Sequence, residues 1–203
     1  YLGGRSAQIG ARSWSRQLAA ETDVLFSEDV QLALHLAYEL HYRGVPGDVV
    51  DAEWDTAVLS FRAGLEDAFE EALLDAVPRP TVAVDECAEA LTALLAEGGP
   101  SLSGFMAERG DIAHLREFAV HRSIYQLREA DGHTWAIPRF AGPGRAALVE
   151  IQMDEYGNGV VGRSHAELFA TTMRALRLDD RYGAYLDLVP ATTLATTNLL
   201  SFL

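Results

Sequence analysis

The stretch GRAALVEIQMDEYGNGVVGRSHAELFATTMRALR, residues 144–177, decides the fold that we predict for this chain. It contains two runs with the apolar spacing of an α-helix, 144–156 and 163–177. The glycine-rich segment from Gly157 to Gly162 separates the two runs and predicts a turn, because glycine interrupts helices and favours turns. Strand signals are nearly absent along the whole chain. The sequence therefore predicts an all-α protein.

The helical pattern continues on both sides of this stretch and stops where glycine or proline occurs. The other expected breaks are Gly44–Gly47, Pro78–Pro80, Gly98–Pro100, Gly132 and Pro138–Gly144. The predicted helices are 11–26, 28–43, 54–77, 82–97, 101–108, 111–130, 144–156, 163–177, 179–188 and 190–203.

The composition of the chain changes near Pro100. The part before it is acidic and amphipathic, and the part after it holds four of the six histidines. We therefore predict an N-terminal helical extension over residues 1–100 and a helical domain that carries the chemistry over 101–203. Helices 28–43 and 54–77 have apolar stripes that need a cover, so the extension is a candidate dimerisation region and we expect a homodimer.

Charge and cysteine content exclude several classes of protein. The 203 residues are 49% hydrophobic, enough for a substantial core. The net charge of −14, from 16 basic and 30 acidic residues, argues against nucleic acid as a partner. A single cysteine, Cys87, excludes an internal disulfide or a thiolate cluster, so any metal must be held by oxygen and nitrogen. No membrane span or signal peptide is evident, and we expect a soluble cytoplasmic protein.

Carboxylates and histidines gather on three predicted helices of the back part, as in an iron site between packed helices. They are His114, Glu117, His121, Glu129, Glu150, Asp154, Glu155 and His165. Each has another interpretation: Glu129, Asp154 and Glu155 as solvated surface carboxylates, and His165 as a core or capping residue. His114, Glu117 and His121 share one helical face and form a second candidate metal patch. His35 and Glu39, near Tyr42, are interpreted as a structural polar contact.

Several of these residues lie in segments that resemble a known family. The segments are EADGHTWAIPR at 129–139, ALVEIQMDEYGNG at 147–159, SHAELF at 164–169, and QLAL and YELHYRG at 31–34 and 38–44. They resemble the bacterial iron-containing redox enzymes, which have a heme-oxygenase-like helical fold and bind two irons instead of heme. The resemblance implies that residues 101–203 are the front part of such a di-iron domain.

The resemblance also implies a set of metal ligands. Family members use a Glu on the first core helix, a second Glu, and a His ten positions after it; these roles fall on Glu129, Glu155 and His165. The family also uses a further Glu and a His-x-x-x-Asp-x-x-His helix, which nothing here matches. The chain ends inside an apolar run, 192–203, so we expect the remaining core helices and ligands beyond Leu203. The other interpretation is that this protein has lost them and binds no di-iron centre.

The function implied is that of a non-heme di-iron oxidase or oxygenase that uses two ferrous ions and dioxygen as co-substrate. The implied substrate is small and resembles an amino acid or a fatty acid, and the reaction is N-oxygenation, desaturation or oxidative C–C cleavage. No catalytic residue other than the metal ligands is predicted. One alternative is a metal-free small-molecule-binding or cofactor-processing protein of the same fold. Another is a helical interaction protein in which residues 1–97 mediate dimerisation and the site is vestigial.

Overall fold

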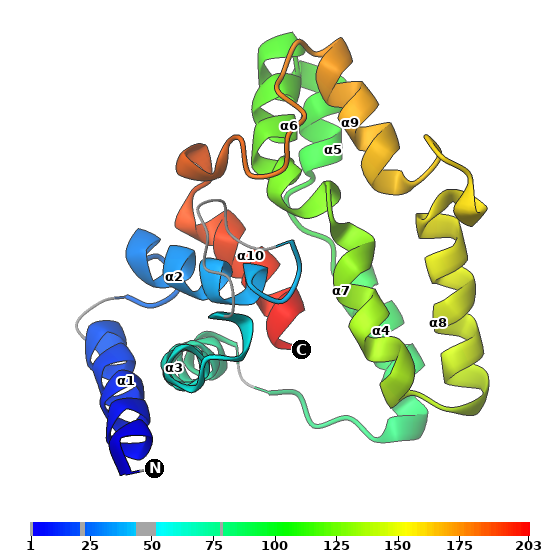
Figure 1. Cartoon of the computed structure of the whole chain (residues 1–203). Helices are drawn as coiled ribbons and strands as arrows, with labels where there is room; N and C mark the ends of the chain where they lie inside the picture. Colours follow the sequence, from blue (N-terminus) through cyan, green and yellow to red (C-terminus); the bar gives the residue numbers. More distant parts are fainter. Residues whose placement is uncertain (1, 21–22, 44–51, 78) are drawn as a thin grey trace.

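The computed structural model describes residues 2–20, 23–43, 52–77 and 79–203, and within this part every regular element is a helix, as predicted (Figure 1). The α-helices are α1 (Leu2–Ala20), α2 (Glu28–Glu39), α3 (Thr56–Ala76), α4 (Cys87–Ala96), α5 (Leu102–Arg109), α6 (Ile112–Gln126), α7 (Glu129–Ala136), α8 (Gly142–Glu155), α9 (His165–Ala175) and α10 (Ala191–Phe202). The 3-10 helices are η1 (Ala52–Trp54), η2 (Val84–Glu86), η3 (Ile137–Arg139), η4 (Gly157–Gly159) and η5 (Leu186–Leu188).

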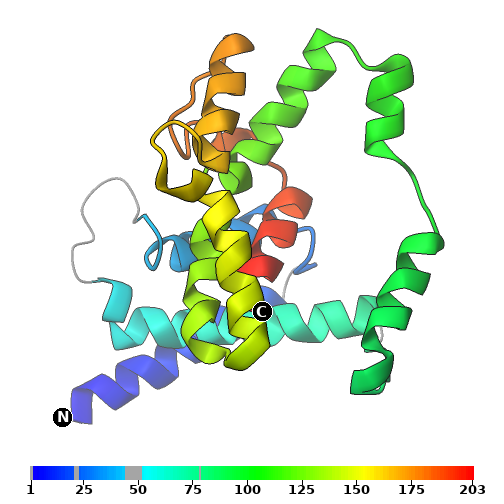
Figure 2. The same ribbon diagram turned by 90° about the vertical axis from the view of Figure 1, so that its right-hand side faces the viewer.

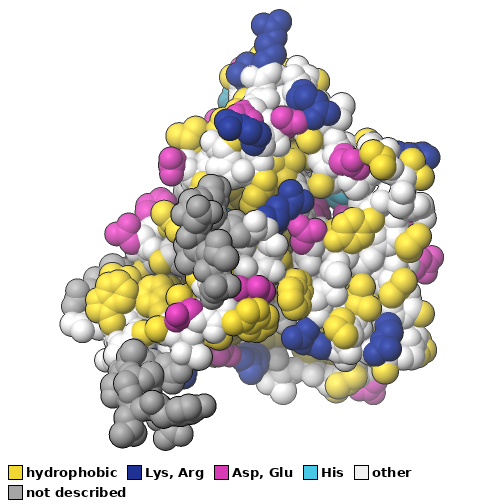
Figure 3. Space-filling view, in the orientation of Figure 1, with side chains coloured by type: hydrophobic (Ala, Val, Ile, Leu, Met, Phe, Trp, Pro, Cys, Tyr) yellow, Lys and Arg dark blue, Asp and Glu magenta, His cyan; other side chains and the backbone are white. Residues whose placement is uncertain are grey.

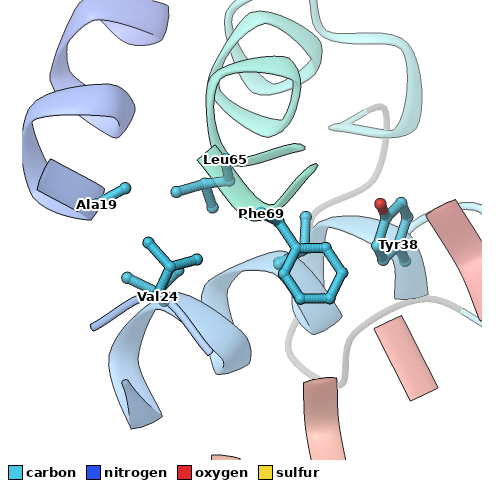
Figure 4. Close-up of a cluster of buried hydrophobic side chains, with 7 residues drawn as sticks. Ala19, Val24, Tyr38, Leu65 and Phe69 are labelled. Carbon is cyan, nitrogen blue, oxygen red and sulfur yellow. The ribbon is translucent and has the colours of Figure 1, made fainter. Parts of the chain in front are cut away.

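Helices α1, α2, α3 and α10 pack together around the main hydrophobic cluster. Val30 and Leu34 of α2 and Leu65 and Phe69 of α3 are fully buried in it. Figure 4 shows the Phe69 ring between these helices. The rings of Phe69 and Phe202, on α10, meet edge to face with their centroids 6.3 Å apart. The apolar stripes expected on the front helices are therefore covered within the chain, in part by α10 from the back half.

Helices α6, α7, α8 and α9 form the second group. The α7–α8 pair is held by Gln152, whose side-chain nitrogen donates to the Ala130 carbonyl at 2.8 Å and to the Thr134 hydroxyl at 2.7 Å. Gln152 is buried, so both bonds are shielded from water. This contact keeps the C-terminal half of α8 close to the start of α7.

Contacts between the two groups run through α2, α6 and α10. Arg43, which follows α2, lies 3.3 Å from Asp131 on α7, and Glu39 forms a buried ion pair with Arg128. Helix α4 lies near the far end of α3 and α5 lies near the start of α6 (Figure 2), and neither α4 nor α5 contains a buried residue. Helices from both sides of the boundary expected at residue 100 thus share one hydrophobic cluster. The role of residues 1–100 as an extension for dimerisation stays a prediction.

Two of the helix predictions are wrong. The helix predicted over 111–130 is two helices, because the chain leaves helical geometry at Arg128, whose φ is −144°; Gly132 lies inside α7 and breaks nothing. The segment 179–188 is mostly turns with only η5 in it. There the Asp179 carboxylate accepts hydrogen bonds from the backbone and side chain of Arg181, which favours a turn.

Smaller differences concern boundaries. Helix α1 begins at Leu2 and ends at Ala20, whereas a helix over 11–26 was predicted. Helix α8 begins at Gly142 with a proline in its first turn, inside the predicted break, because the missing proline N–H costs nothing there. The breaks predicted at Gly44–Gly47 and at Pro78 lie outside the described residues.

The surface in Figure 3 shows acidic and basic side chains interspersed among hydrophobic ones. Within the described part of the chain, each helix is too short or too polar to cross a lipid bilayer.

Candidate metal centre

Glu129 is presented by the break between α6 and α7. Leu127 and Arg128 are buried at this break, and Glu129 is the first residue of α7. The side chain of Glu129 is 18% exposed, so it points into the molecule more than into solvent. A single helix continuing through residue 128 would carry Glu129 in another direction, so the break decides where this carboxylate points.

Glu155 and His165 are brought together by the turn between α8 and α9. Glu155 ends α8, and His165 begins α9 directly after Ser164, whose hydroxyl caps the helix by accepting from the Glu167 backbone N–H. Gly157 makes the turn possible: its φ is +60°, and a Cβ added there would lie 2.4 Å from the carbonyl carbon of Arg163. The predicted break at Gly157–Gly162 is thus a close approach of two backbone segments.

The three residues meet at one point. One ligand atom from each of Glu129, Glu155 and His165 lies within 4.8 Å of the other two. His165 Nδ1 is 2.9 Å from Glu155 Oε2 and 3.3 Å from Glu129 Oε2. The structure therefore brings together the three side chains that the sequence selected, and their role as metal ligands stays a prediction.

The donor set fits iron. Two carboxylates and one imidazole are ligands that ferrous iron accepts, and they come from three different helices, as in carboxylate-bridged sites of helical bundles. Glu129 Oε2 is buried and accepts no hydrogen bond, although His165 Nδ1 lies nearby. A buried carboxylate oxygen without a donor is costly, and a cation would remove that cost. The trio lines a cleft of about 250 Å³, which leaves room for a ligand.

Tyr125 is a further residue of the site that the sequence reasoning missed. Burial, together with the negative charges of Glu129 and Glu155, raises the pKa of Tyr125 to about 12. The phenol is therefore protonated at neutral pH, so it is a hydrogen-bond donor beside the Glu129 carboxylate. Tyr125 precedes Glu129 by four positions, and this i, i+4 spacing within the predicted helix 111–130 is the sequence signal that could have found it.

A polar network continues from the trio along the cleft. The Tyr156 hydroxyl donates to Asp131 Oδ1 at 3.1 Å, and Arg43 Nε lies 3.3 Å from Asp131 Oδ2. Burial raises the pKa of Tyr156, so this phenol also stays protonated. Arg43 follows α2, so a residue of the front half reaches the rim of the cleft.

The second candidate metal patch is not assembled. Among the described residues, Glu129, Glu155 and His165 are the one group of His, Cys, Asp or Glu close enough to share an ion. His114 is used in the capping box of α6, with Nδ1 2.7 Å from Asp111 Oδ1, and its ring meets the edge of Phe105. His114 and His121 instead line a larger cavity of about 530 Å³ between α5, α6 and α10.

Comparison with known proteins supports the assignment of this region. Residues 116–203 match the family model described as iron-containing redox enzyme. The match includes α7, α8 and α9 and therefore all three residues of the trio. No curated protein matches the chain. The family resemblance seen in the sequence is confirmed for this region, and the family is one of oxidoreductases that contain iron.

Proposed function

We propose that this chain, whose residues 116–203 match the family model of iron-containing redox enzymes, is part of a non-heme di-iron enzyme that uses dioxygen to oxidise a small substrate. Glu129, Glu155 and His165 would hold the iron. The observation that carries the proposal is the convergence of these three side chains within 4.8 Å. A second ion needs further ligands, and the described residues outside the trio offer no other such group.

Reduction of dioxygen is the chemistry that ferrous iron supplies at such a site. The protein's part is to hold the ligands and to protect the reaction from bulk water. Tyr125 places a protonated phenol beside Glu129, where it would orient that carboxylate as a hydrogen-bond donor. The turn at Gly157 holds Glu155 and His165 close together. Both side chains are partly exposed, so the cleft is open to solvent on their side.

The larger cavity supports an amino-acid-like substrate over a fatty acid. Tyr125 lies in the wall of this cavity and also contacts Glu129, so the cavity adjoins the proposed iron site. Its lining combines Phe105 and Phe118 with the opposite charges of Glu117 and Arg122. A carboxylate could pair with Arg122 and an ammonium group with Glu117, whereas a long apolar chain would leave both charges unpaired. N-oxygenation, desaturation and oxidative C–C cleavage are the reactions that we propose for such a substrate.

A homodimer is part of the proposal. Leu91, Leu94 and Leu95 on α4 are each more than half exposed, and they form an apolar face on a helix without buried residues. Such a face on a helix at the side of the molecule favours a contact with a second copy. Light scattering of the full-length protein at micromolar concentration should give a dimer, and Leu94→Glu should shift it toward monomer. A wild-type monomer at that concentration would exclude this part of the proposal.

Iron loading tests the assignment of the ligands. The full-length protein is reconstituted with ferrous iron without oxygen, desalted, and analysed for bound iron by mass spectrometry. Wild-type protein should retain iron, whereas Glu155→Ala and His165→Ala should lose most of it because each removes a ligand. The control is Asp154→Asn, which removes an exposed carboxylate from the neighbouring position of the same helix. Equal iron in all four proteins would refute the ligand assignment.

One observation favours a second candidate, a metal-free protein of the same fold. His165 Nδ1 and Glu155 Oε2 lie at a hydrogen-bond distance of 2.9 Å, a pairing typical of acid–base groups. Wild-type protein that retains no iron after reconstitution, and consumes no oxygen when ferrous iron is present, would favour this candidate.

A further inference from the structure

A buried ion pair lies directly beside the proposed metal centre. Arg128 Nε is 2.8 Å from Glu39 Oε1, and both side chains are at most 4% exposed. Glu39 is the last residue of α2, in the front half of the chain, whereas Arg128 occupies the break between α6 and α7. The residue after Arg128 is Glu129. The pair therefore joins the front half of the molecule to the segment that presents a proposed iron ligand.

Other side chains hold the Arg128 guanidinium in place. Its Nε donates to the Tyr182 hydroxyl at 2.9 Å, and its central carbon lies 4.3 Å from the centre of the Tyr42 ring. Tyr182 also lines the cleft that contains the trio. The guanidinium is thus fixed on several sides, through a carboxylate, a phenol and an aromatic face.

Stability alone does not explain this arrangement. A buried ion pair pays for desolvation on both partners, and apolar side chains of similar size often stabilise a fold equally well. Burial raises the pKa of Glu39, and the neighbouring Arg128 opposes that rise. The pair instead fixes the position of the Arg128 side chain, because a buried guanidinium is favourable only where its partners surround it.

The position of the Arg128 side chain matters because its backbone forms the break between α6 and α7. Its φ of −144° and ψ of 13° lie outside helical geometry, and its side chain makes no capping bond to α7. Besides the backbone bond from its N–H to the Tyr125 carbonyl at 2.9 Å, the guanidinium contacts are the side-chain interactions that hold this residue at the break. If Arg128 relaxed to helical geometry, α6 would continue through residue 128 and Glu129 would turn away from Glu155 and His165.

We propose that Arg128 is a positioning residue, held by Glu39 and Tyr182, that fixes the α6–α7 break so that Glu129 faces Glu155 and His165. Helix α2 of the front half is then part of the support of the metal centre. This inference rests on the proposed iron site, and it adds residues that contact no iron ligand through their side chains. It predicts that changes at Glu39 alter metal binding from a distance.

The test compares ferrous iron affinity with stability in the full-length protein. Affinity is measured without oxygen by competition with a chelator, and stability by urea unfolding of the metal-free protein. Glu39→Gln should lower the affinity by about tenfold to a hundredfold, the usual range for residues that orient metal ligands. Tyr182→Phe keeps the ring and removes one contact, so it should lower the affinity less. The visible absorption of bound cobalt, which reports ligand geometry, should change in both variants.

Gln31→Met is the matched control. Gln31 is buried on the same helix and donates to the Val24 carbonyl at 2.8 Å, but it belongs to a contact with α10 and not to the α6–α7 break. The Gln31→Met protein should be less stable than wild type, but its iron affinity and its cobalt spectrum should equal those of wild type. A purely structural role for Glu39 predicts instead that affinity follows stability in all variants.

Each outcome decides the inference. Weaker iron binding in Glu39→Gln and Tyr182→Phe, with unchanged binding in Gln31→Met, supports it. Unchanged affinity in a folded Glu39→Gln, or an equal loss in Gln31→Met, overturns it. If Glu39→Gln does not fold, Tyr182→Phe decides the question in the same way. Wild-type protein that binds no iron would instead refute the proposed function on which the inference rests.

Discussion

Replacing His35 with glutamine should change how the stability of this protein depends on pH. His35 lies on α2, is 2% exposed, and sits 3.9 Å from Glu39. Burial lowers its pKa from 6.5 to about 4, because the charged imidazolium loses its hydration, and the positive charge of Arg128 lowers it further. His35 is therefore neutral in the folded protein at neutral pH.

The magnitude follows from the difference between the two pKa values. Above pH 6.5 the side chain is neutral in both states and titration has no effect on the free energy of unfolding. Between pH 6.5 and 4 the unfolded chain binds a proton that the folded protein does not, which destabilises the fold by about 1.4 kcal/mol for each pH unit. From pH 7 to pH 5 the loss due to His35 is about 2 kcal/mol.

Urea unfolding of the metal-free protein at pH 7 and pH 5 measures this loss. His35→Gln should be less stable than wild type at pH 7, because the packing around the buried ring is disturbed. At pH 5 the difference should shrink by about 2 kcal/mol, since only wild type carries the titrating imidazole. Gln31→Met, at a buried position without a titrating group, should differ from wild type equally at both pH values. A constant difference for His35→Gln would refute the burial argument.

Three further predictions concern stability. Phe69→Ala should lower the free energy of unfolding by about 3–5 kcal/mol, measured by urea unfolding, because Phe69 is fully buried in the main cluster; a loss below about 1 kcal/mol would contradict that packing. Gly157→Ala should cost at least about 2 kcal/mol, because the new Cβ meets the backbone of Arg163 at 2.4 Å, and a thermal unfolding midpoint equal to that of wild type would argue against this close approach. Ser164→Ala removes the cap of α9 and should cost about 1 kcal/mol by urea unfolding, while Ser164→Asp, which can also cap, should restore most of it; equal losses in both would show that capping is not the cause.

Local signals in the sequence were enough for most of the helices and for part of the site. Apolar periodicity predicted α2, α3, α8, α9 and α10 to within a few residues, because their packing faces follow the helical repeat. Glu155 and His165 are close in the chain and joined by a glycine turn, so their proximity follows from local geometry. The family resemblance added Glu129, which spacing alone does not distinguish from a surface carboxylate.

What the sequence by itself determined is therefore the all-α class and the local α8–turn–α9 unit. The break at Arg128 belongs to the tertiary structure, because the guanidinium of this residue is buried against a carboxylate on α2, far away in the chain. The helical pattern of 111–130 contains no glycine or proline at that point, so no local signal marks it. The i, i+4 spacing of Tyr125 and Glu129 was present in the sequence, but no motif singled out this tyrosine as part of the site. A buried charge must meet its partner in space, and that requirement can override the helical preference of the residues around it.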